Sequence, residues 1–236
     1  MKKISIIICN YNNQKYITKC LRSIYKQNIN KKLFDVIFVD DGSTDKSVNY
    51  AKKFMKYENF HLIKNRKNLG LIKSCNIAIK KCKTKYLVRV DSDDYISKNF
   101  LKYFFREMNL DYDFIYSNYI VEKNNKKFKK KLKKFDILKL ISCSVVMKTN
   151  LVKKIGGYRN IFWEECDLYV RYLKDNRKKV KHLDKYVYIY RKHGFNMTFS
   201  RKRRLLAWRE FFKKYSKFTI KKINRSVEKK MDILNK

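Results

Sequence analysis

The sequence predicts an α/β fold with a mostly parallel central sheet flanked by helices. Two apolar runs rich in β-branched residues, Ile4–Ile8 and Asp35–Val39, have the composition of strands buried on both faces. Apolar residues at helical spacing lie between and after these runs, so strands and helices alternate over the first ninety residues. This alternation favours parallel strands joined by helical crossovers, in a doubly wound sheet.

The elements of this first half follow from their apolar spacing. The helix between the two runs has a stripe at i, i+4, i+7 and i+8, formed by Ile17, Leu21, Ile24 and Tyr25. A second helix is expected to begin at a cap on Ser43 or Thr44 and to present Val48, Ala51 and Met55. A short strand over 61–63, a helix over 71–82 and a strand over 86–90 complete the pattern.

Beyond residue 95 the pattern is looser. Helices are expected over 100–108 and 165–174, strands over 114–119 and 144–147, and a pair of basic amphipathic helices over 201–236. The stretch Lys123–Lys134 holds eight lysines and no acid, which indicates a mobile loop or an edge hairpin.

The charge of the chain is extreme but evenly spread. Its 236 residues include 60 Lys and Arg against 21 Asp and Glu, a formal net charge of +39. Such an excess suggests nucleic acid or an anionic membrane as a partner. However, 47 of the basic residues are lysine, 23 residues are isoleucine, 21 are asparagine and none is proline, a bias that AT-rich codons produce without selection for charge. Nucleic acid is therefore not the expected partner.

Cysteine usage and hydropathy indicate a cytoplasmic protein. The six cysteines form no C-x-x-C pair and have no zinc-site spacing, so we expect small buried thiols in a reducing compartment. The apolar N-terminal run is cut short by Asn10–Asn13, so this run is not expected to act as a signal peptide. No segment approaches the roughly 18 apolar residues of a membrane span, so the protein is expected to be soluble or at most membrane-peripheral.

Acidic residues, scarce in this chain, cluster after two of the predicted strands. Asp40 and Asp41 follow the strand over 35–39, and Asp91, Asp93 and Asp94 follow the strand over 86–90. Ligands of open parallel sheets bind at the carboxyl ends of strands, so both clusters should border one crevice. Clustered carboxylates repel one another unless a hard cation such as Mg²⁺ or Mn²⁺ neutralises them, and such a cation also binds diphosphates. Because the P-loop and dinucleotide-binding motifs are both absent, a metal is expected to neutralise the phosphates.

A set of motifs, in order, resembles the inverting, nucleotide-sugar-dependent glycosyltransferases of family 2, which have a GT-A fold. The resemblance covers Ile4 to about Thr198. Its motifs are Ser5–Asn12, Val39–Asp45, Asn68–Gly70 with Asn76, Asp91–Asp94, Gly156–Tyr158, Trp163–Leu168 and Tyr190–His193. The resemblance implies a GT-A domain over 1–200, with a nucleotide-binding half over 1–95 and an acceptor-binding half over 96–200, followed by the helices of 201–236.

The resemblance implies a donor site and a metal site. Tyr11 would stack on the nucleotide base and Asp41 would accept a hydrogen bond from it, which favours a UDP-sugar. The other donor-binding positions implied are Cys9, where the family often has proline, Asn68, Lys73, Asp91 and Asp93. Lys73 and Arg89 would lie near the phosphates, although either could be an ordinary solvated or paired charge. Mn²⁺ or Mg²⁺ would be held by Asp93, Asp94 and His193, and the sequence does not choose between the two aspartates.

Catalysis is implied for the acidic segment 164–167. An inverting transfer needs one carboxylate to deprotonate the acceptor hydroxyl. Glu165 stands at the family's base position, where aspartate is usual, and Glu164 is the other catalytic candidate. Asp167 is interpreted as a structural acid in the first turn of a helix. Trp163 is expected either to stack on an acceptor sugar or to pack within the protein.

The predicted function is transfer of one sugar to a saccharide or lipid-linked glycan in the biosynthesis of a cell-surface polysaccharide or lipopolysaccharide. The basic helices of 201–236 have the composition of interfacial helices and could contact the anionic inner membrane or simply pack on the domain. The alternative hypothesis is a polyanion-binding protein, for example for RNA, with a vestigial transferase site.

Overall fold

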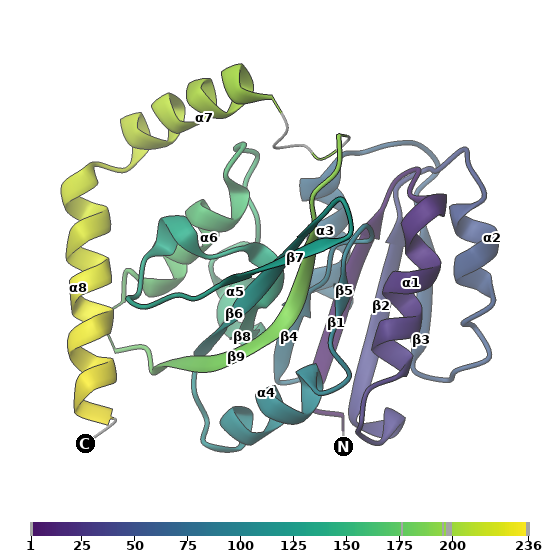
Figure 1. Cartoon of the computed structure of the whole chain (residues 1–236), viewed down its shortest axis with the longest axis horizontal. Helices are drawn as coiled ribbons and strands as arrows, with labels where there is room; N and C mark the ends of the chain where they lie inside the picture. The colour runs from purple at the N-terminus through teal and green to yellow at the C-terminus, as the bar shows by residue number, and fades with distance from the viewer. Residues whose placement is uncertain (1, 176, 195, 197–199, 235–236) are drawn as a thin grey trace.

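Helices cover both faces of one central sheet in the computed structural model, which describes residues 2–234 except 176, 195 and 197–199 (Figure 1). Thr198, where the resemblance ends, lies outside the described residues. The described strands form a nine-stranded sheet in the order β3-β2-β1-β4-β8-β6-β9-β5, and β7 pairs with β6 off this path.

The first half confirms the predicted parallel sheet. Its strands are β1 (Ile4–Asn10), β2 (Phe34–Asp40), β3 (Phe60–Lys64) and β4 (Tyr86–Arg89). They pair in parallel, and Ile4 on the central strand lies opposite both Phe34 and Tyr86. The crossover helices are α1 (Gln14–Tyr25), α2 (Ser47–Lys52) and α3 (Leu71–Lys81). The predicted stripe of α1 is buried.

The prediction for the second helix is wrong at both ends. α2 begins at Ser47 after an N-cap residue, Lys46, that makes no side-chain cap bond. The Ser43 hydroxyl instead accepts hydrogen bonds from the Asn12 amide and the Asn10 side chain, so it ties two loops together. Met55 lies beyond the end of α2 and is 57% exposed.

The second half makes the sheet mixed. β8 (Val145–Lys148) is antiparallel to β4 and to β6 (Phe114–Lys123), whereas β9 (Val180–Arg191) is parallel to β6 and antiparallel to β5 (Tyr95–Ile96). Neither β5 nor β9 was predicted from the sequence. The first half of β9 is rich in charged residues, and its pairing with β6 has a register shift. The strand therefore lacks a regular alternation of apolar and polar residues over its whole length.

The lysine-rich stretch forms an edge hairpin, one of its two predicted structures. β7 (Lys126–Lys130) pairs antiparallel with the end of β6, and all five of its residues are exposed. Asn124 and Asn125 both have positive φ, as a tight hairpin turn requires. Lysines along this edge disfavour pairing with a further strand.

The core is divided by the sheet into two layers. One layer packs α1 and α4 (Phe100–Asn109) on the sheet, and the other packs α3, α5 (Thr149–Lys154), α6 (Glu164–Leu173) and the C-terminal helices. Short 3₁₀ turns occur at Lys31–Leu33, Ile137–Lys139 and Ser142–Ser144. Each layer buries the apolar faces of its helices against the strands.

The two predicted C-terminal helices are present as α7 (Arg201–Lys214) and α8 (Lys217–Leu234), which lie along one side of the molecule (Figure 1). Phe211 of α7 and Ile220, Ile223 and Val227 of α8 are buried in the layer that contains α6. No helix in the described part of the chain has the length and apolarity that a bilayer crossing requires.

Candidate active site

The two acidic clusters lie at one edge of the sheet, and the loop after β1 is bonded to both. Within this loop, the Asn12 side chain accepts a hydrogen bond from the Thr44 amide at 2.9 Å, beside the first cluster. The next side chain, Asn13, donates to the Ser92 hydroxyl at 2.7 Å, within the second cluster. The strand ends of β1, β2 and β4 are thus joined by side-chain bonds at the carboxyl edge, where ligands of such sheets bind.

Asp41 orders the loop that precedes α3. It is 3% exposed, and its carboxylate accepts hydrogen bonds from the Asn65 side chain and from the amides of Leu69 and Gly70, each at 2.8 Å. The loop passes so close that a Cβ on Gly42, whose φ is +73°, would lie 2.6 Å from the Lys67 carbonyl carbon. Three bonds leave one of about four acceptor positions of the carboxylate for a ligand.

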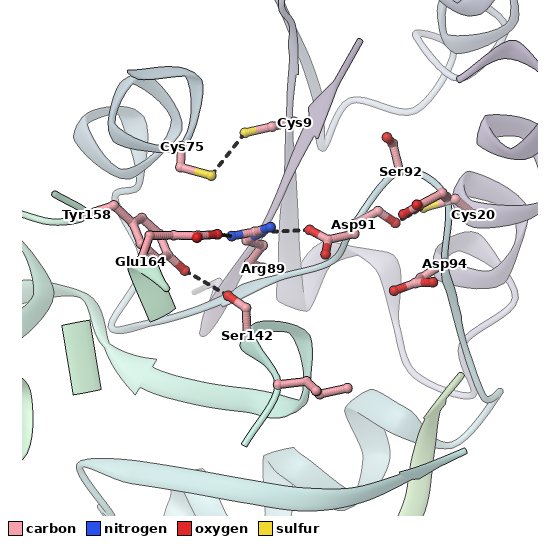
Figure 2. Close-up of polar contacts among 12 residues, drawn as sticks. Cys9, Cys20, Cys75, Arg89, Asp91, Ser92, Asp94, Ser142, Tyr158 and Glu164 are labelled. Carbon is pink, nitrogen blue, oxygen red and sulfur yellow. Dashed lines mark hydrogen bonds and ion pairs between the residues drawn. The ribbon is translucent and has the colours of Figure 1, made fainter. Parts of the chain in front are cut away.

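The other predicted donor residues differ in exposure. Tyr11, just beyond β1, has 45% of its surface exposed, so its ring is available to a planar ligand. Asn68 and Lys73 are also exposed, and the Asn68 side chain accepts a bond from the Gly70 amide. Cys9 is half-buried, and its thiol donates to the Cys75 thiol at 3.5 Å (Figure 2).

Asp93 and His193 meet, although a hundred residues separate them in the chain. The His193 imidazole Nε2 lies 3.0 Å from Asp93 Oδ2. The ring stacks on Tyr16 of α1 with centroids 4.7 Å apart, and the Asn196 side chain accepts a bond from the His193 amide. Only the family resemblance had predicted that these two residues meet, and the roles of Tyr16 and Asn196 were not predicted.

Asp94 is held from within the protein. It is fully buried, and its two oxygens accept bonds from the Tyr188 hydroxyl and the Arg191 amide, both at 2.6 Å. Burial and the neighbouring charges of Asp93 and Asp91 raise the pKa of Asp94. Tyr188 and Arg191 lie on β9, so a strand that the sequence did not reveal positions this part of the site.

The side chains present suit a hard divalent cation at Asp93. A carboxylate oxygen and an imidazole nitrogen, close together, are ligands that Mn²⁺ accepts. A second cluster brings Asp91, Asp94 and the Cys143 thiol within 4.8 Å of one another. Burial raises the pKa of that thiol, and a neutral thiol is a poor ligand for Mg²⁺ or Mn²⁺.

Three acids share the first turn of α6, and Asp167 is the structural one. Its carboxylate, which has no exposed surface, accepts bonds from Arg171 at 2.7 Å, Lys214 at 2.8 Å and Tyr215 at 2.7 Å. Burial alone would raise the pKa of Asp167, but these three donors outweigh it and lower the pKa. Asp167 therefore ties α6 to the end of α7.

Glu165 has different surroundings. It is half-buried, and among the described residues no other group donates a hydrogen bond or ion pair to its carboxylate. Burial and the adjacent charge of Glu164 raise the pKa of Glu165. A carboxylate without a partner and with a raised pKa is a stronger base than an ordinary surface glutamate.

Glu164 is paired with Arg89, a buried cation at the end of β4. The Arg89 Nη1 donates to Glu164 Oε1 at 2.9 Å, and its Nε donates to Asp91 Oδ1 at 2.6 Å. Figure 2 shows the guanidinium lying between the two carboxylates. Of the two interpretations that the sequence left for Arg89, the paired charge is therefore the observed one.

Trp163, the residue before α6, packs within the protein. Its ring stacks on Trp208 of α7 with centroids 4.4 Å apart, and Phe162 lies edge-on to it. The indole N–H is buried and has no hydrogen-bond partner among the described residues. Packing, one of the two expected roles, accounts for one face of the ring.

A cavity of about 340 Å³ lies next to His193. Its lining includes Lys123 from the end of β6, Lys192 just after β9 and Arg204 of α7, together with Asn124 and Asn196. Among the described residues that line this cavity there is no carboxylate, so these walls are basic. A phosphate-bearing ligand would complement them.

The family model described as "Glycosyl transferase family 2" matches residues 5–169. The chain belongs to this family. The match covers both acidic clusters and the acidic turn of α6, whereas His193 and the residues of β9 that hold Asp94 lie beyond it.

Two relatives of this family 2 chain act on phosphate polymers by name. One is the poly(ribitol-phosphate) β-N-acetylglucosaminyltransferase TarS of Staphylococcus aureus, 40% identical over 103 residues, which are 43% of this chain and 18% of TarS. Another is a poly(ribitol-phosphate) β-glucosyltransferase of Bacillus spizizenii, 42% identical over 101 residues, which are 42% of this chain and 16% of the relative. The matched region thus spans less than a fifth of either relative.

Solved structures agree on the GT-A fold of this family 2 chain. The crystal structure of S. aureus TarS residues 1–349 with UDP-GlcNAc has a TM-score of 0.71 and 27% identity, and covers 81% of this chain and 59% of that one. The mannosyltransferase PcManGT of Pyrobaculum calidifontis, in complex with GDP-Man and Mn²⁺, has a TM-score of 0.71 at 13% identity, over 95% of this chain and 68% of that one. This second likeness shows the fold alone.

Proposed function

We propose that this family 2 protein is an inverting glycosyltransferase that moves a sugar from a UDP-sugar to a hydroxyl of a cell-surface glycan. The observation that carries the proposal is Glu165, a half-buried carboxylate without a partner whose neighbour Glu164 is bonded, through Arg89, to Asp91 at the strand edge. The family match and the relatives support a glycosyltransferase and give no support to the polyanion-binding alternative.

The donor is proposed to bind across the ends of β1, β2 and β4. The exposed ring of Tyr11 would stack on the uracil, and the remaining acceptor position of Asp41 would take the N–H of the base. Asn68 and Lys73 would flank the nucleotide, Asp91 would face the ribose, and Cys9 would line the floor beside Tyr11. The TarS complex with UDP-GlcNAc supports UDP as the nucleotide.

Asp93 and His193 are proposed to hold Mn²⁺ or Mg²⁺. Their side chains already lie 3.0 Å apart, whereas both oxygens of Asp94, the third implied ligand, are engaged by Tyr188 and Arg191. When bound, the cation would neutralise negative charge on the departing diphosphate. Asp94 would then act mainly by fixing the loop after β4 onto β9.

Glu165 is proposed to be the general base. Its carboxylate would take the proton of the acceptor hydroxyl while the acceptor oxygen attacks the anomeric carbon from the face opposite UDP. The bond between that carbon and the phosphate oxygen would break, and UDP would leave with the electron pair. One displacement inverts the configuration, so an α-linked nucleotide sugar would give a β-linked product, which is the linkage in the name of TarS.

The acceptor is proposed to be a glycan or polyol polymer that carries phosphate, such as a teichoic acid. Both relatives named above act, by name, on poly(ribitol phosphate), and the basic cavity beside His193 would complement phosphate groups. Trp163, one face of which is covered by Trp208, would contact the acceptor only with its remaining surface. A lipopolysaccharide precursor is the other acceptor to be tested beside poly(ribitol phosphate).

Peripheral contact with an anionic membrane is proposed for the C-terminal helices. Leu205, Leu206 and Phe218 are 50% or more exposed, and basic residues of α7 surround the first two. Exposed apolar side chains among cations are typical of interfacial helices. The protein should co-sediment with phosphatidylglycerol vesicles, and the double variant Leu205→Ser with Leu206→Ser should remain in the supernatant. Binding that survives both changes would contradict this role.

Calorimetric titration of UDP, GDP, CDP and dTDP, with and without Mn²⁺, tests the donor proposal. We expect UDP to bind best, more tightly with Mn²⁺ than without it, and the metal effect to disappear in Asp93→Ala with Asp94→Ala. A folded protein that binds none of the four would contradict the proposed function. For the transfer itself, UDP release from UDP-GlcNAc would be followed with and without poly(ribitol phosphate).

A further inference from the structure

Arg89 is a buried cation that bonds two separate parts of the candidate site. The residue is 6% exposed, and its guanidinium reaches Asp91 with Nε and Glu164 with Nη1. Asp91 belongs to the loop after β4, whereas Glu164 begins α6 and is followed directly by Glu165. Asp91 and Glu164 are separated by 72 residues in the sequence, and the Arg89 guanidinium links their side chains directly.

The surroundings hold this guanidinium in place. It lies over the Tyr158 ring, 5.8 Å from the ring centre, and the Tyr158 hydroxyl is 3.1 Å from the Ser142 hydroxyl. The Asn76 side chain bonds both the amide and the carbonyl of Tyr158 at 2.9 Å. The planar fork of an arginine directs two N–H groups at fixed angles, which the single ammonium of a lysine does not.

We propose that Arg89 and Glu164 are a positioning pair that sets the base Glu165 relative to the donor-binding Asp91. The inference rests on the proposed function, because it assigns roles within the same reaction. Arg89 would touch neither the acceptor hydroxyl nor the anomeric carbon. It would fix the start of α6 against the end of β4, and misplacement of reacting groups by about 1 Å can cost roughly 10²-fold in rate.

Glu164 would have a second, electrostatic effect on its neighbour. The charged groups that act on Glu165 are Glu164, Arg89 and Asp91, and the titratable side chains of Tyr169 and Cys166 also lie near it. The negative charge of Glu164 raises the pKa of Glu165, so its removal should lower that pKa. The base would then remain deprotonated at lower pH.

The test measures kcat, KM for UDP-GlcNAc and the pH profile of kcat for R89K and E164Q, with R171K as the matched control. Arg171, on the same helix as Glu164, makes an equally short ion pair with Asp167 but contacts neither Asp91 nor Glu164. R89K should lower kcat at least about tenfold while KM changes by less than about threefold. E164Q, which keeps an oxygen for Arg89, should move the acid limb of the profile to lower pH. R171K should change neither kcat nor the acid limb of the pH profile.

The outcomes separate this inference from the function on which it rests. Wild-type protein that transfers sugar, with R89K equal to R171K in kcat and E164Q unshifted in its acid limb, overturns the positioning pair alone. Wild-type protein that transfers no sugar from any UDP-sugar overturns the proposed function and the pair with it. If R89K fails to fold, the pH profile of the isosteric E164Q is used instead. An acid limb at lower pH supports the positioning pair, and an unshifted acid limb overturns it.

Discussion

The acidic loop after β4 and the acidic first turn of α6 each contain three carboxylates, but their partners differ. In the loop, Asp91 is bonded to Arg89, Asp93 to His193 and Asp94 to β9. In the turn, Glu164 and Asp167 are bonded to cations, and Glu165 is not. Five of the six carboxylates are thus held by hydrogen bonds or ion pairs, and the carboxylate of Glu165 is not. A free carboxylate among bonded ones is the strongest structural sign of a base in this molecule.

The largest loss of unfolding free energy is expected when Asp167 is replaced. Asp167→Ala removes a buried carboxylate from Arg171, Lys214 and Tyr215 and leaves two cations without their partner. Breaking a buried pair in this way costs about 3 kcal/mol of unfolding free energy. Urea denaturation measures the change. Asp175→Ala is the control, because its pairs with Arg177 and Lys178 lie at the surface, and an equal loss there would contradict the comparison.

A smaller effect is expected for His193 in the loop cluster. His193→Ala removes the imidazole beside Asp93 and should weaken Mn²⁺ binding about tenfold, or about 1.4 kcal/mol. Titration of Mn²⁺ in the presence of UDP measures the loss. His61→Ala is matched to it, since His61 also lies 3.0 Å from an aspartate, Asp35, but on β3. Unchanged affinity in His193→Ala would contradict the metal proposal.

The subtlest effect is a difference of sign between Glu165 and Asp167 in the pH dependence of stability. The pKa of Glu165 is raised on folding, so its burial costs stability increasingly as pH rises above about 4.3, and Glu165→Gln should gain on the wild type there. The pKa of Asp167 is lowered, so its contribution is complete above about pH 4 and lost as pH falls below it. Asp167→Asn should therefore differ most from wild type near neutral pH and least in acid.

Denaturation midpoints of the two variants between pH 3 and pH 8 measure this difference. At pH 8 Glu165→Gln should lie above the wild type and Asp167→Asn below it, and both differences should shrink as the pH falls toward 3. Variants that change stability in the same direction at pH 8 would contradict the distinction between the two carboxylates.

The sequence was sufficient for elements whose pattern is local. The buried runs of β1 and β2 and the stripe of α1 follow from residues a few positions apart, and all three are present. β9 was missed because its pairing partner, β6, lies more than fifty residues earlier and its own first half is charged. The cap of α2 was misassigned because Ser43 bonds to another loop instead of to its own helix.

The same limit applies to the site. The clusters themselves were visible, because acids are scarce and follow predicted strands. Their partners were not, since Arg89 and Glu164 are 75 positions apart, and Asp167 meets Lys214 across 47. A regular alternation of tyrosines over 186–190 was the one local signal for Tyr188, the partner of Asp94.

Turnover of Glu165→Gln tests the central claim most directly. UDP release in the presence of poly(ribitol phosphate) would be compared among wild type, Glu165→Gln and Asp167→Asn, each corrected for the folded fraction. Glu165→Gln should retain UDP affinity and lose roughly 10³-fold in kcat, whereas folded Asp167→Asn should stay within about tenfold of wild type. A Glu165→Gln variant with more than a tenth of the wild-type kcat would contradict the assignment of Glu165 as the base.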